Sequence, residues 1–222
     1  AGVKDPSHVY QYGGKYTVTL TITLGDEIDR AIKQDYITVI GGPQPTPTIG
    51  PYDPTKIHLF SGWNFISVAR NLADGYSNAS AVFRDVPTGG HAIWAYDPAR
   101  QYWDQVLTGT VIAPLNGYWI YSVTPYTINL TFKNDPISAP VTRSLPTGWA
   151  AIGFTGGNPA TAKDTLKSVK DAWIYARGYN AQHQQWESTI VNGGQGESTY
   201  LFPSKGYWLY MEKPGTLAAI GV

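Results

Sequence analysis

The sequence predicts an all-β protein with a minor helical part. Glycine and proline are frequent, with 24 Gly and 16 Pro among 222 residues, and they divide the chain into short segments bounded by turns. Aromatic residues make up 14% of the chain, and many stand in strand-favouring runs such as Gly-Tyr-Trp at 117–119 and 206–208. Together these features predict many short strands joined by tight turns.

The first expected element is a strand at residues 15–24, where apolar and threonine residues alternate strictly. Five side chains should share its apolar face: Tyr16, Val18, Leu20, Ile22 and Leu24. A polar turn is expected at 25–31, followed by a second strand at 35–40. Residues 1–40 therefore predict a small β segment with one apolar face.

The motif "HVYQYGGKYTVTLTI…YITVI" in this segment resembles the C-terminal half of a PKD domain, an immunoglobulin-like sandwich of exported proteins. His8, Tyr10, Gly14 and the run 16–21 match the pattern of that family. The family's earlier strands and its "WDFGDG" motif are missing. The resemblance implies a partial Ig-like β segment, whose apolar face should be covered by another part of the protein or by a neighbouring copy.

A stretch rich in Pro and Thr at residues 41–54 marks the clearest boundary. Alternating Pro and Thr favour polyproline II and cannot donate a continuous strand ladder, so we expect a semi-rigid linker. The composition also changes here, because residues 1–40 contain no Trp and residues 51–222 contain all eight. The linker therefore separates two regions of different architecture.

The region after the linker contains an internal duplication, which predicts β repeats at 55–136 and 137–222. Each copy contains Gly-Trp, then Trp-x-Tyr, then a second Trp, and then Gly-Tyr-Trp, in this order. The order pairs the tryptophans of the two copies: Trp63 with Trp149, Trp94 with Trp173, Trp103 with Trp186, and Trp119 with Trp208. We expect two tandem small β-sandwich or barrel-like units of four or five strands.

Each repeat should contain a hairpin between the Trp-x-Tyr segment and the second Trp. The turn carries Asp-Pro in the first copy and Gly and Asn in the second. The Gly-Tyr-Trp strand is expected to pair with the last strand of its copy, at 127–132 or 216–221. A short helix is expected at 158–172, where Ala162, Leu166 and Val169 fall on one apolar face, with a shorter counterpart at 78–86.

The ordered pattern "GWN-IS…W-YD…W…GYWI" resembles a repeat of large secreted and cell-surface proteins of archaea and bacteria, often found beside PKD domains. The resemblance covers most of 55–222. Ala150 and Gly153 depart from it, because the first copy has Asn64 and Ser67 at these places. The resemblance implies an extracellular structural or adhesive module and carries over no catalytic residue.

The eight tryptophans allow two interpretations. They could form platforms on which sugars stack, or they could fill the cores of small β units that lack long helices. Because the positions recur in both copies, we expect core packing for most of them, and we expect Trp119 and Trp208 to be largely buried. Trp103 and Trp186 lie in polar hairpin strands, so a carbohydrate-binding face would contain them. Their neighbours on such a face would be Tyr102 and Tyr179.

The composition and motifs argue against an enzyme and against a cofactor. No histidine has a second one at metal-binding spacing, no serine stands in a Gly-x-Ser-x-Gly turn, and cysteine is absent. Asp26, Glu27 and Asp29 are weak calcium candidates, with a solvated turn as the alternative. Asn78 and Asn129 begin two N-glycosylation sequons.

The charge balance excludes two classes of partner. Charged residues are only 14% of the chain and the formal net charge is zero, whereas nucleic acids and anionic membrane surfaces require a basic face. No apolar run approaches the roughly 20 residues that span a bilayer.

The leading hypothesis is a non-enzymatic extracellular structural and assembly module of a prokaryotic cell surface, as in a surface layer, sheath, filament or stalk. Its partners would be other copies of itself or neighbouring domains of the same surface protein. The alternative is a carbohydrate-binding or adhesion module, with or without an attached exported hydrolase, whose partners would be glycans.

Overall fold

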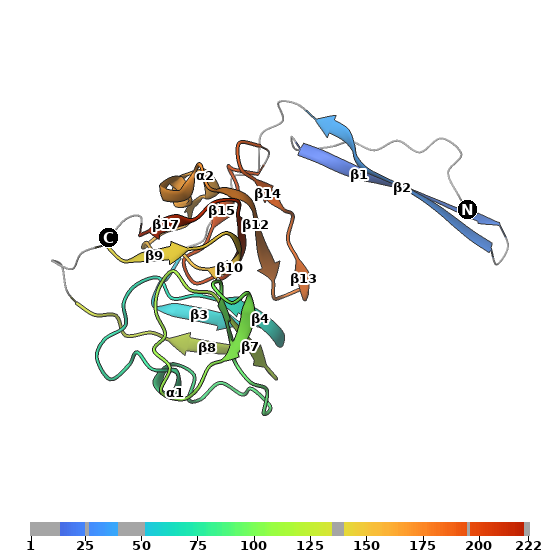
Figure 1. Cartoon of the computed structure of the whole chain (residues 1–222). Coiled ribbons are helices and arrows are strands. Elements are labelled where there is room, and N and C mark those ends of the chain that lie inside the picture. Colours follow the sequence, from blue (N-terminus) through green and yellow to red (C-terminus); the bar gives the residue numbers. More distant parts are fainter. Residues whose placement is uncertain (1–13, 25–26, 40–51, 135–139, 195, 220–222) are drawn as a thin grey trace. The chain divides into compact units, whose positions relative to one another are not determined.

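The computed structural model describes residues 14–24, 27–39, 52–134, 140–194 and 196–219 (Figure 1). The chain forms two compact units, residues 1–49 and 50–222. Helix among the described residues is limited to two four-residue α-helices and one 3-10 turn. The prediction of an all-β fold with a minor helical part is confirmed. No helix in the described ranges is long and apolar enough to cross a membrane.

The first unit contains an antiparallel hairpin of β1 (Gly14–Leu24) and β2 (Glu27–Val39). The polar turn predicted at 25–31 is wrong from Glu27 onward, because these residues already pair with β1 and Asp29 lies opposite Ile22. Strand pairing therefore continues through a segment whose charged residues suggested a turn. His8 and Tyr10 lie outside the described residues, as does most of the linker expected at 41–54.

The apolar face of β1 is largely open within this hairpin. Leu20 and Ile22 are more than half exposed, whereas Tyr16 and Val18 are half-buried. The two described strands of this unit supply no further layer that would cover such side chains. The covering of this face by another segment or another copy stays a prediction.

The second unit consists of two halves, and the first half comprises residues 52–134. Four strands form one antiparallel sheet in the order β4 (Gly62–Ile66), β7 (Tyr118–Ser122), β5 (Trp94–Asp97) and β6 (Tyr102–Gln105). The first and last strands form a separate pair: β3 (Lys56–Leu59) and β8 (Tyr126–Asn129). The helix α1 (Ala79–Val82) lies at the place where the sequence predicts the shorter helical segment.

The second half, residues 140–219, repeats this order. Its main sheet runs β10 (Gly148–Ile152), β16 (Tyr207–Met211), β12 (Trp173–Asn180) and β13 (Gln185–Trp186), and β14 (Ile190–Val191) also pairs with β12. The remaining pairs are β9 (Thr142–Leu145) with β17 (Gly215–Ala218) and β11 (Ala160–Thr161) with β15 (Tyr200–Leu201). The helical elements are α2 (Ala162–Thr165) and η1 (Lys167–Val169). One strand order in both halves is what an internal duplication predicts.

The partner of the Gly-Tyr-Trp strand differs from the sequence-based expectation. The strand β7 lies between β4 and β5, and β16 lies between β10 and β12, whereas β8 and β17 pair with the first strands of their own halves. The predicted pairing with the last strand is therefore wrong. As a central strand, β7 turns Tyr118, Ile120 and Ser122 into the core and presents Trp119 and Tyr121 on the opposite face.

The two apolar cores are mainly aliphatic. Ala162, Leu166 and Val169 are all buried in the core of the second half, as their spacing predicted. Among the eight tryptophans only Trp173 belongs to a core, at 3% exposure. The prediction that tryptophans fill the cores is therefore wrong for the other seven. Trp119 and Trp208, which the sequence predicts to be largely buried, have intermediate exposure and belong to neither core.

Candidate aromatic binding face

The two halves of the second unit meet through reciprocal backbone contacts. The N–H of Gly117 donates to the carbonyl of Ala151 at 3.1 Å, and the N–H of Gly206 donates to the carbonyl of Phe65 at 2.9 Å. The two glycines occupy the same place in their halves, and so do Phe65 and Ala151, which lie opposite the Trp of the central strand. Contacts that recur with the roles exchanged indicate a two-fold relation. A pseudo-two-fold axis therefore passes between the halves.

Two glutamines form the same kind of reciprocal contact at the hairpin turns. Gln101 accepts from the N–H of Trp149 and donates to its carbonyl, both at 2.9 Å. Gln184 binds the backbone of Trp63 in the same way, at 2.8 and 2.9 Å. The glycine before each tryptophan has a positive φ, and a Cβ there would lie 2.5 or 2.8 Å from the glutamine side chain. Each half thus binds the Gly-Trp strand of the other through a glutamine side chain. We call Gln101 and Gln184 the clasping glutamines.

Aromatic side chains of each hairpin pack against the central-strand tryptophan of the opposite half. The rings of Tyr179 and Trp186 lie 4.8 and 5.6 Å from the ring of Trp119, centre to centre. The same contacts occur with the halves exchanged, at 4.8 and 5.3 Å: Tyr96 and Trp103 against Trp208. All four pairs are edge-to-face, a favourable geometry for aromatic rings. The hairpins and sheets therefore build one aromatic face from both halves.

Two open grooves lie on this face. The first groove has a volume of about 600 Å³ and is lined by Trp63, Trp94, Tyr102, Trp103, Trp119, Tyr179 and Trp186. The second groove has a volume of about 420 Å³ and is lined by Tyr96, Gln101, Trp103, Trp149, Arg177, Trp186 and Trp208. Both volumes fall within the range of small-molecule sites, about 300–1,000 Å³. Because Trp103 and Trp186 line both grooves, the grooves meet at the pseudo-two-fold axis.

The structure brings the four residues proposed for a carbohydrate face into one groove. Tyr102, Trp103, Tyr179 and Trp186 all line the first groove, although the two hairpins belong to different halves. Tyr102 is 63% and Trp186 is 38% exposed, so their rings are accessible to a ligand. The sequence reasoning missed the sheet tryptophans of this groove, such as Trp119. The available signal was strand alternation, because a residue between two core positions faces away from the core.

The register of the central strands corrects one pair of equivalent residues. Trp94 lies opposite Trp119 in the first half, and the residue opposite Trp208 in the second half is Arg177. Trp173 lies at the start of its strand, before a register shift. The predicted equivalence of Trp94 with Trp173 is therefore wrong, and Trp94 corresponds to Arg177. The first groove has an indole where the second has a guanidinium.

Arg177 gives the second groove a positive charge. Its Nε donates to the backbone carbonyl of Glu187 at 2.7 Å, and its guanidinium lies 5.6 Å from the centre of the Trp186 ring. The Glu187 carboxylate pairs with Lys205 instead. Within the described ranges no carboxylate lies within ion-pair distance of Arg177. The positive charge of Arg177 therefore lies over an aromatic ring, and no acidic side chain of the described residues pairs with it.

Neutral polar groups also border the grooves. The hydroxyl of Tyr96 donates to Gln101 Oε1 at 3.4 Å, and that of Tyr179 donates to Gln184 Oε1 at 3.3 Å. Desolvation raises the pKa of both tyrosines, and the charge of Asp97 adds to the rise for Tyr96. Both side chains therefore stay uncharged at neutral pH and present hydroxyl groups beside the tryptophans.

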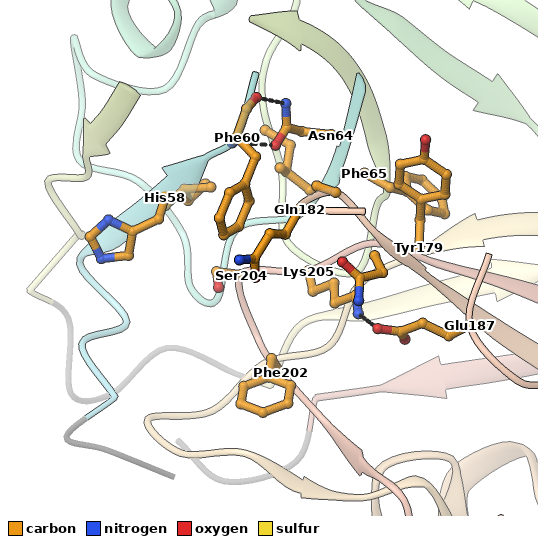
Figure 2. A pocket seen from close by; sticks show the side chains of 14 residues that line it. His58, Phe60, Asn64, Phe65, Tyr179, Gln182, Glu187, Phe202, Ser204 and Lys205 are labelled. Atoms are coloured by element: carbon orange, nitrogen blue, oxygen red, sulfur yellow. Dashed lines mark hydrogen bonds and ion pairs between the residues drawn. The ribbon is translucent and has the colours of Figure 1, made fainter. Parts of the chain in front are cut away.

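A smaller cleft of about 290 Å³ lies between the halves (Figure 2). Its polar side chains are largely satisfied within the protein. The Asn64 amide accepts from the N–H of Phe60 and donates to its carbonyl, both at 2.8 Å, and Lys205 pairs with Glu187 (Figure 2). The second half has Ala150 at the position equivalent to Asn64, so this amide occurs only in the first half. The cleft therefore offers few free polar groups to a ligand.

The counterpart of this cleft across the pseudo-axis is filled by Arg143. Its Nη1 donates to the carbonyls of Leu115 and Ala151 at 2.9 and 2.6 Å. The equivalents of these two carbonyls belong to Ser204 and Phe65, which line the cleft. Burial lowers the pKa of Arg143 to about 10, so it remains protonated at neutral pH. The cleft is open because the residue equivalent to Arg143 is an aliphatic one, Ile57.

The structure does not bring the other candidate residues of the sequence together in one site. Asp26 lies outside the described residues, Glu27 begins β2, and Asp29 is exposed. Over the residues that the structure describes, no group of three or more His, Cys, Asp or Glu side chains could hold a metal. The side chain of Asn78 caps α1, and Asn129 is exposed at the end of β8. Use of either sequon stays a prediction.

Comparison of the chain with protein-family models, with curated proteins and with solved structures gave no match. The resemblances to a PKD domain and to a cell-surface repeat therefore stay predictions. The geometry of the aromatic face carries the functional argument.

Proposed function

We propose that residues 50–222 form a non-enzymatic carbohydrate-binding module of an extracellular adhesion protein, with the aromatic face as its binding surface. The observation that carries this proposal is the convergence of seven aromatic side chains from both halves on the first groove. Soluble proteins rarely expose large contiguous apolar patches, and such patches mark interaction sites. The tryptophans that the cores do not use are gathered in one place.

A sugar chain fits the chemistry of this groove. The C–H faces of pyranose rings stack on aromatic rings, while their hydroxyls need hydrogen-bonding partners beside those rings. The first groove supplies both, because five of its seven lining residues are tryptophan and its two tyrosines carry hydroxyl groups. No charged residue lines it. A proline-rich peptide is the competing occupant, since such peptides also dock in aromatic grooves.

The test is a glycan array followed by calorimetry on wild type, Trp103→Ala and Trp186→Ala. Each substitution removes a ring shared by both grooves, and we expect at least a tenfold loss of affinity, or about 1.4 kcal/mol. Tyr76→Ala is the control, because Tyr76 is 57% exposed and lines neither groove. Folding of each variant is checked by thermal melting. Absence of glycan binding, or binding to proline-rich peptides alone, would overturn the proposal.

A structural and assembly role is the second candidate, and the exposed hairpin of the first unit favours it. Leu20, Ile22, Ile32 and Tyr36 are each more than half exposed on β1 and β2. An exposed strand edge with apolar side chains can extend a sheet with another copy of the chain. Sedimentation over a wide concentration range, with and without residues 1–42, tests this role. A full chain that stays monomeric throughout, or an unchanged assembly after the deletion, would exclude it.

A further inference from the structure

We infer that the two grooves together bind one directional, acidic oligosaccharide, with a neutral sugar residue in the first groove and a carboxylate-bearing residue beside Arg177 in the second. This inference rests on the proposed function and specifies the class of its ligand. Three features support it: the two rings that the grooves share, the symmetry that relates the grooves, and the one position at which their lining changes from aromatic to charged.

The grooves adjoin each other at two shared rings. Trp103 and Trp186 line both of them, and they are equivalent residues of the two halves. Trp186 contacts Trp119 in the first groove, and Trp103 contacts Trp208 in the second. These two rings therefore form the boundary that the grooves share, and no other lining residue among those described is common to both. A ligand chain longer than one groove therefore passes over these rings into the other.

The pseudo-two-fold axis constrains how such a chain can bind. A chain that crosses the axis meets the second groove in the opposite direction from the first. An oligosaccharide has a reducing and a non-reducing end and does not possess this symmetry. Two identical grooves therefore could not hold successive parts of one chain by the same contacts. A single directional ligand requires that the two grooves differ in their chemistry.

The grooves differ most at Trp94 and its equivalent, Arg177. Other lining positions keep their residue type across the axis: Trp63 and Trp149, Trp119 and Trp208, Tyr179 and Tyr96. The change at this position replaces an apolar stacking surface with a cation. A second difference is at Tyr102, which lines only the first groove and whose equivalent is Gln185. Of the two differences, only the one at Arg177 introduces a charge, and we infer that it changes what that part of the groove binds.

The setting of Arg177 favours a carboxylate. A guanidinium can donate two parallel hydrogen bonds to a carboxylate, and such charge-assisted bonds are strong. Here Nε is held by the Glu187 carbonyl and the guanidinium lies over Trp186, so its orientation is fixed before a ligand binds. No acidic side chain among the described residues neutralises it. An acidic sugar would supply the missing negative charge.

The experiment compares two ligands that differ only in charge. The probe is a hexasaccharide that alternates uronate and neutral amino-sugar residues, and its partner is the same compound with each carboxyl reduced to a primary alcohol. We expect wild type to bind the acidic form at least tenfold more tightly at low ionic strength. Raising the salt concentration should narrow this ratio, because screening weakens the ion pair.

Variants at position 177 then locate the preference. Arg177→Gln should reduce the ratio of the two affinities to about one, and Arg177→Lys should retain part of it. Lys163→Gln is the charge-matched control, because Lys163 is exposed on α2 and lines neither groove. The ratio is measured within each variant, so a change in stability that affects both ligands equally does not alter it.

The outcomes separate this inference from the proposed function. If the probes or other glycans bind but Arg177→Gln leaves the ratio unchanged, the inference is wrong and the carbohydrate-binding function stands. If wild type binds only neutral glycans, the assignment of an acidic ligand fails in the same way. If no glycan binds, the proposed function itself fails and the inference fails with it.

Discussion

The two halves of the second unit share one strand order but differ where they face each other. Phe65 and Ala151 are equivalents, yet only Phe65 fills the space beside Gly117 and Gly206. Near a two-fold axis, equivalent residues approach one another, so two large side chains would compete for one space. The comparison teaches that a duplicated sequence must diverge where two equivalent side chains would occupy one space. At other places in the same interface, as in the clasping glutamines, it can keep the same residue twice.

The largest expected effect comes from the aromatic residue at this interface. Phe65 is 3% exposed, and its ring is stacked on Trp119 at 4.7 Å with an interplanar angle of 2°. Phe65→Ala should lower the free energy of unfolding by about 3–5 kcal/mol, because it leaves a cavity between the halves. Chemical denaturation measures the change, with the more exposed Phe60→Ala as control. A loss below about 1 kcal/mol would show that the halves do not depend on this ring.

A second variant makes the two halves alike at the axis. A Cβ at Gly153 would overlap the side chain of Ser67, its equivalent in the first half. Gly153→Ser should therefore cost about 1–3 kcal/mol of unfolding free energy, since it overpacks the interface. The exchanged pair, Ser67→Gly with Gly153→Ser, should recover most of the loss in the same denaturation assay. Failure of the exchange to recover stability would contradict the steric explanation.

Ser67→Ala is the matched control for this pair. The Ser67 hydroxyl is buried and has no hydrogen-bond partner among the described residues. Removing an unsatisfied buried hydroxyl relieves a desolvation cost, so this variant should be neutral or slightly more stable than wild type.

The clasping glutamines should behave alike, because each binds the backbone N–H and carbonyl of a tryptophan in the opposite half. Gln101→Ala removes two hydrogen bonds to the opposite half, and Gln184→Ala removes the same two and a longer one of 3.4 Å to the carbonyl of Ser61. Each substitution should cost about 1–2 kcal/mol. Gln185→Ala is the control and should have little effect, because the side chain of Gln185 makes no hydrogen bond to the opposite half within the described residues. Thermal and chemical denaturation give the comparison. A difference above about 1 kcal/mol between the two variants would show that the clasps are not equivalent.

The smallest expected effect is at Arg143, the counterpart of Ile57. The pKa of Arg143, about 10, lies below the ordinary value of an arginine, because burial disfavours the charged form. The guanidinium is charged in both folded and unfolded chains below pH 10, so this cost is present throughout that range. The two hydrogen bonds to carbonyls offset part of it. Arg143→Ile should therefore change stability by about 1 kcal/mol or less.

Denaturation at neutral pH checks this value. Ser144→Ile introduces the same side chain at the neighbouring exposed position of β9 and serves as control. A loss above about 3 kcal/mol from Arg143→Ile would show that the buried guanidinium is essential to the second half rather than a filler of its cleft.

The sequence predicted turns better than it predicted strand pairing. The hairpin β5–β6 turns after Asp97, where Asp-Pro indicates a turn, because a turn depends on a few adjacent residues. The hairpin β12–β13 is also present, but Gly178 lies inside β12 and the turn begins only after Asn180. The partners of β7 and β16 lie far away in the sequence, and no local pattern specifies which distant strand is adjacent. The same limit applies to Arg177, whose equivalence with Trp94 depends on a register shift inside β12.

The candidate site was only partly visible in the sequence for a related reason. Polar neighbours such as Gln101 and Asp104 indicated that Trp103 is partly exposed, and its exposure is intermediate. Trp119 stands in a run that is apolar on both sides, and alternation alone does not say which face meets the core. The structure resolves this choice, because Tyr118 and Ile120 take the core positions. The clasp between hairpin and sheet depends on three-dimensional contact and left no signal in the sequence.

The pairing of first and last strands has a mechanical consequence. A pulling force on the ends of the first half acts at one end of the β3–β8 ladder, on the pair Lys56 and Asn129. In the second half it acts on Thr142 and Ala218 of the β9–β17 ladder. Hydrogen bonds loaded in this way break one after another, not all together, so both ladders open under low tension. Under load the chain would lengthen at these outer strands first, while the sheets that carry the tryptophans stay clasped together.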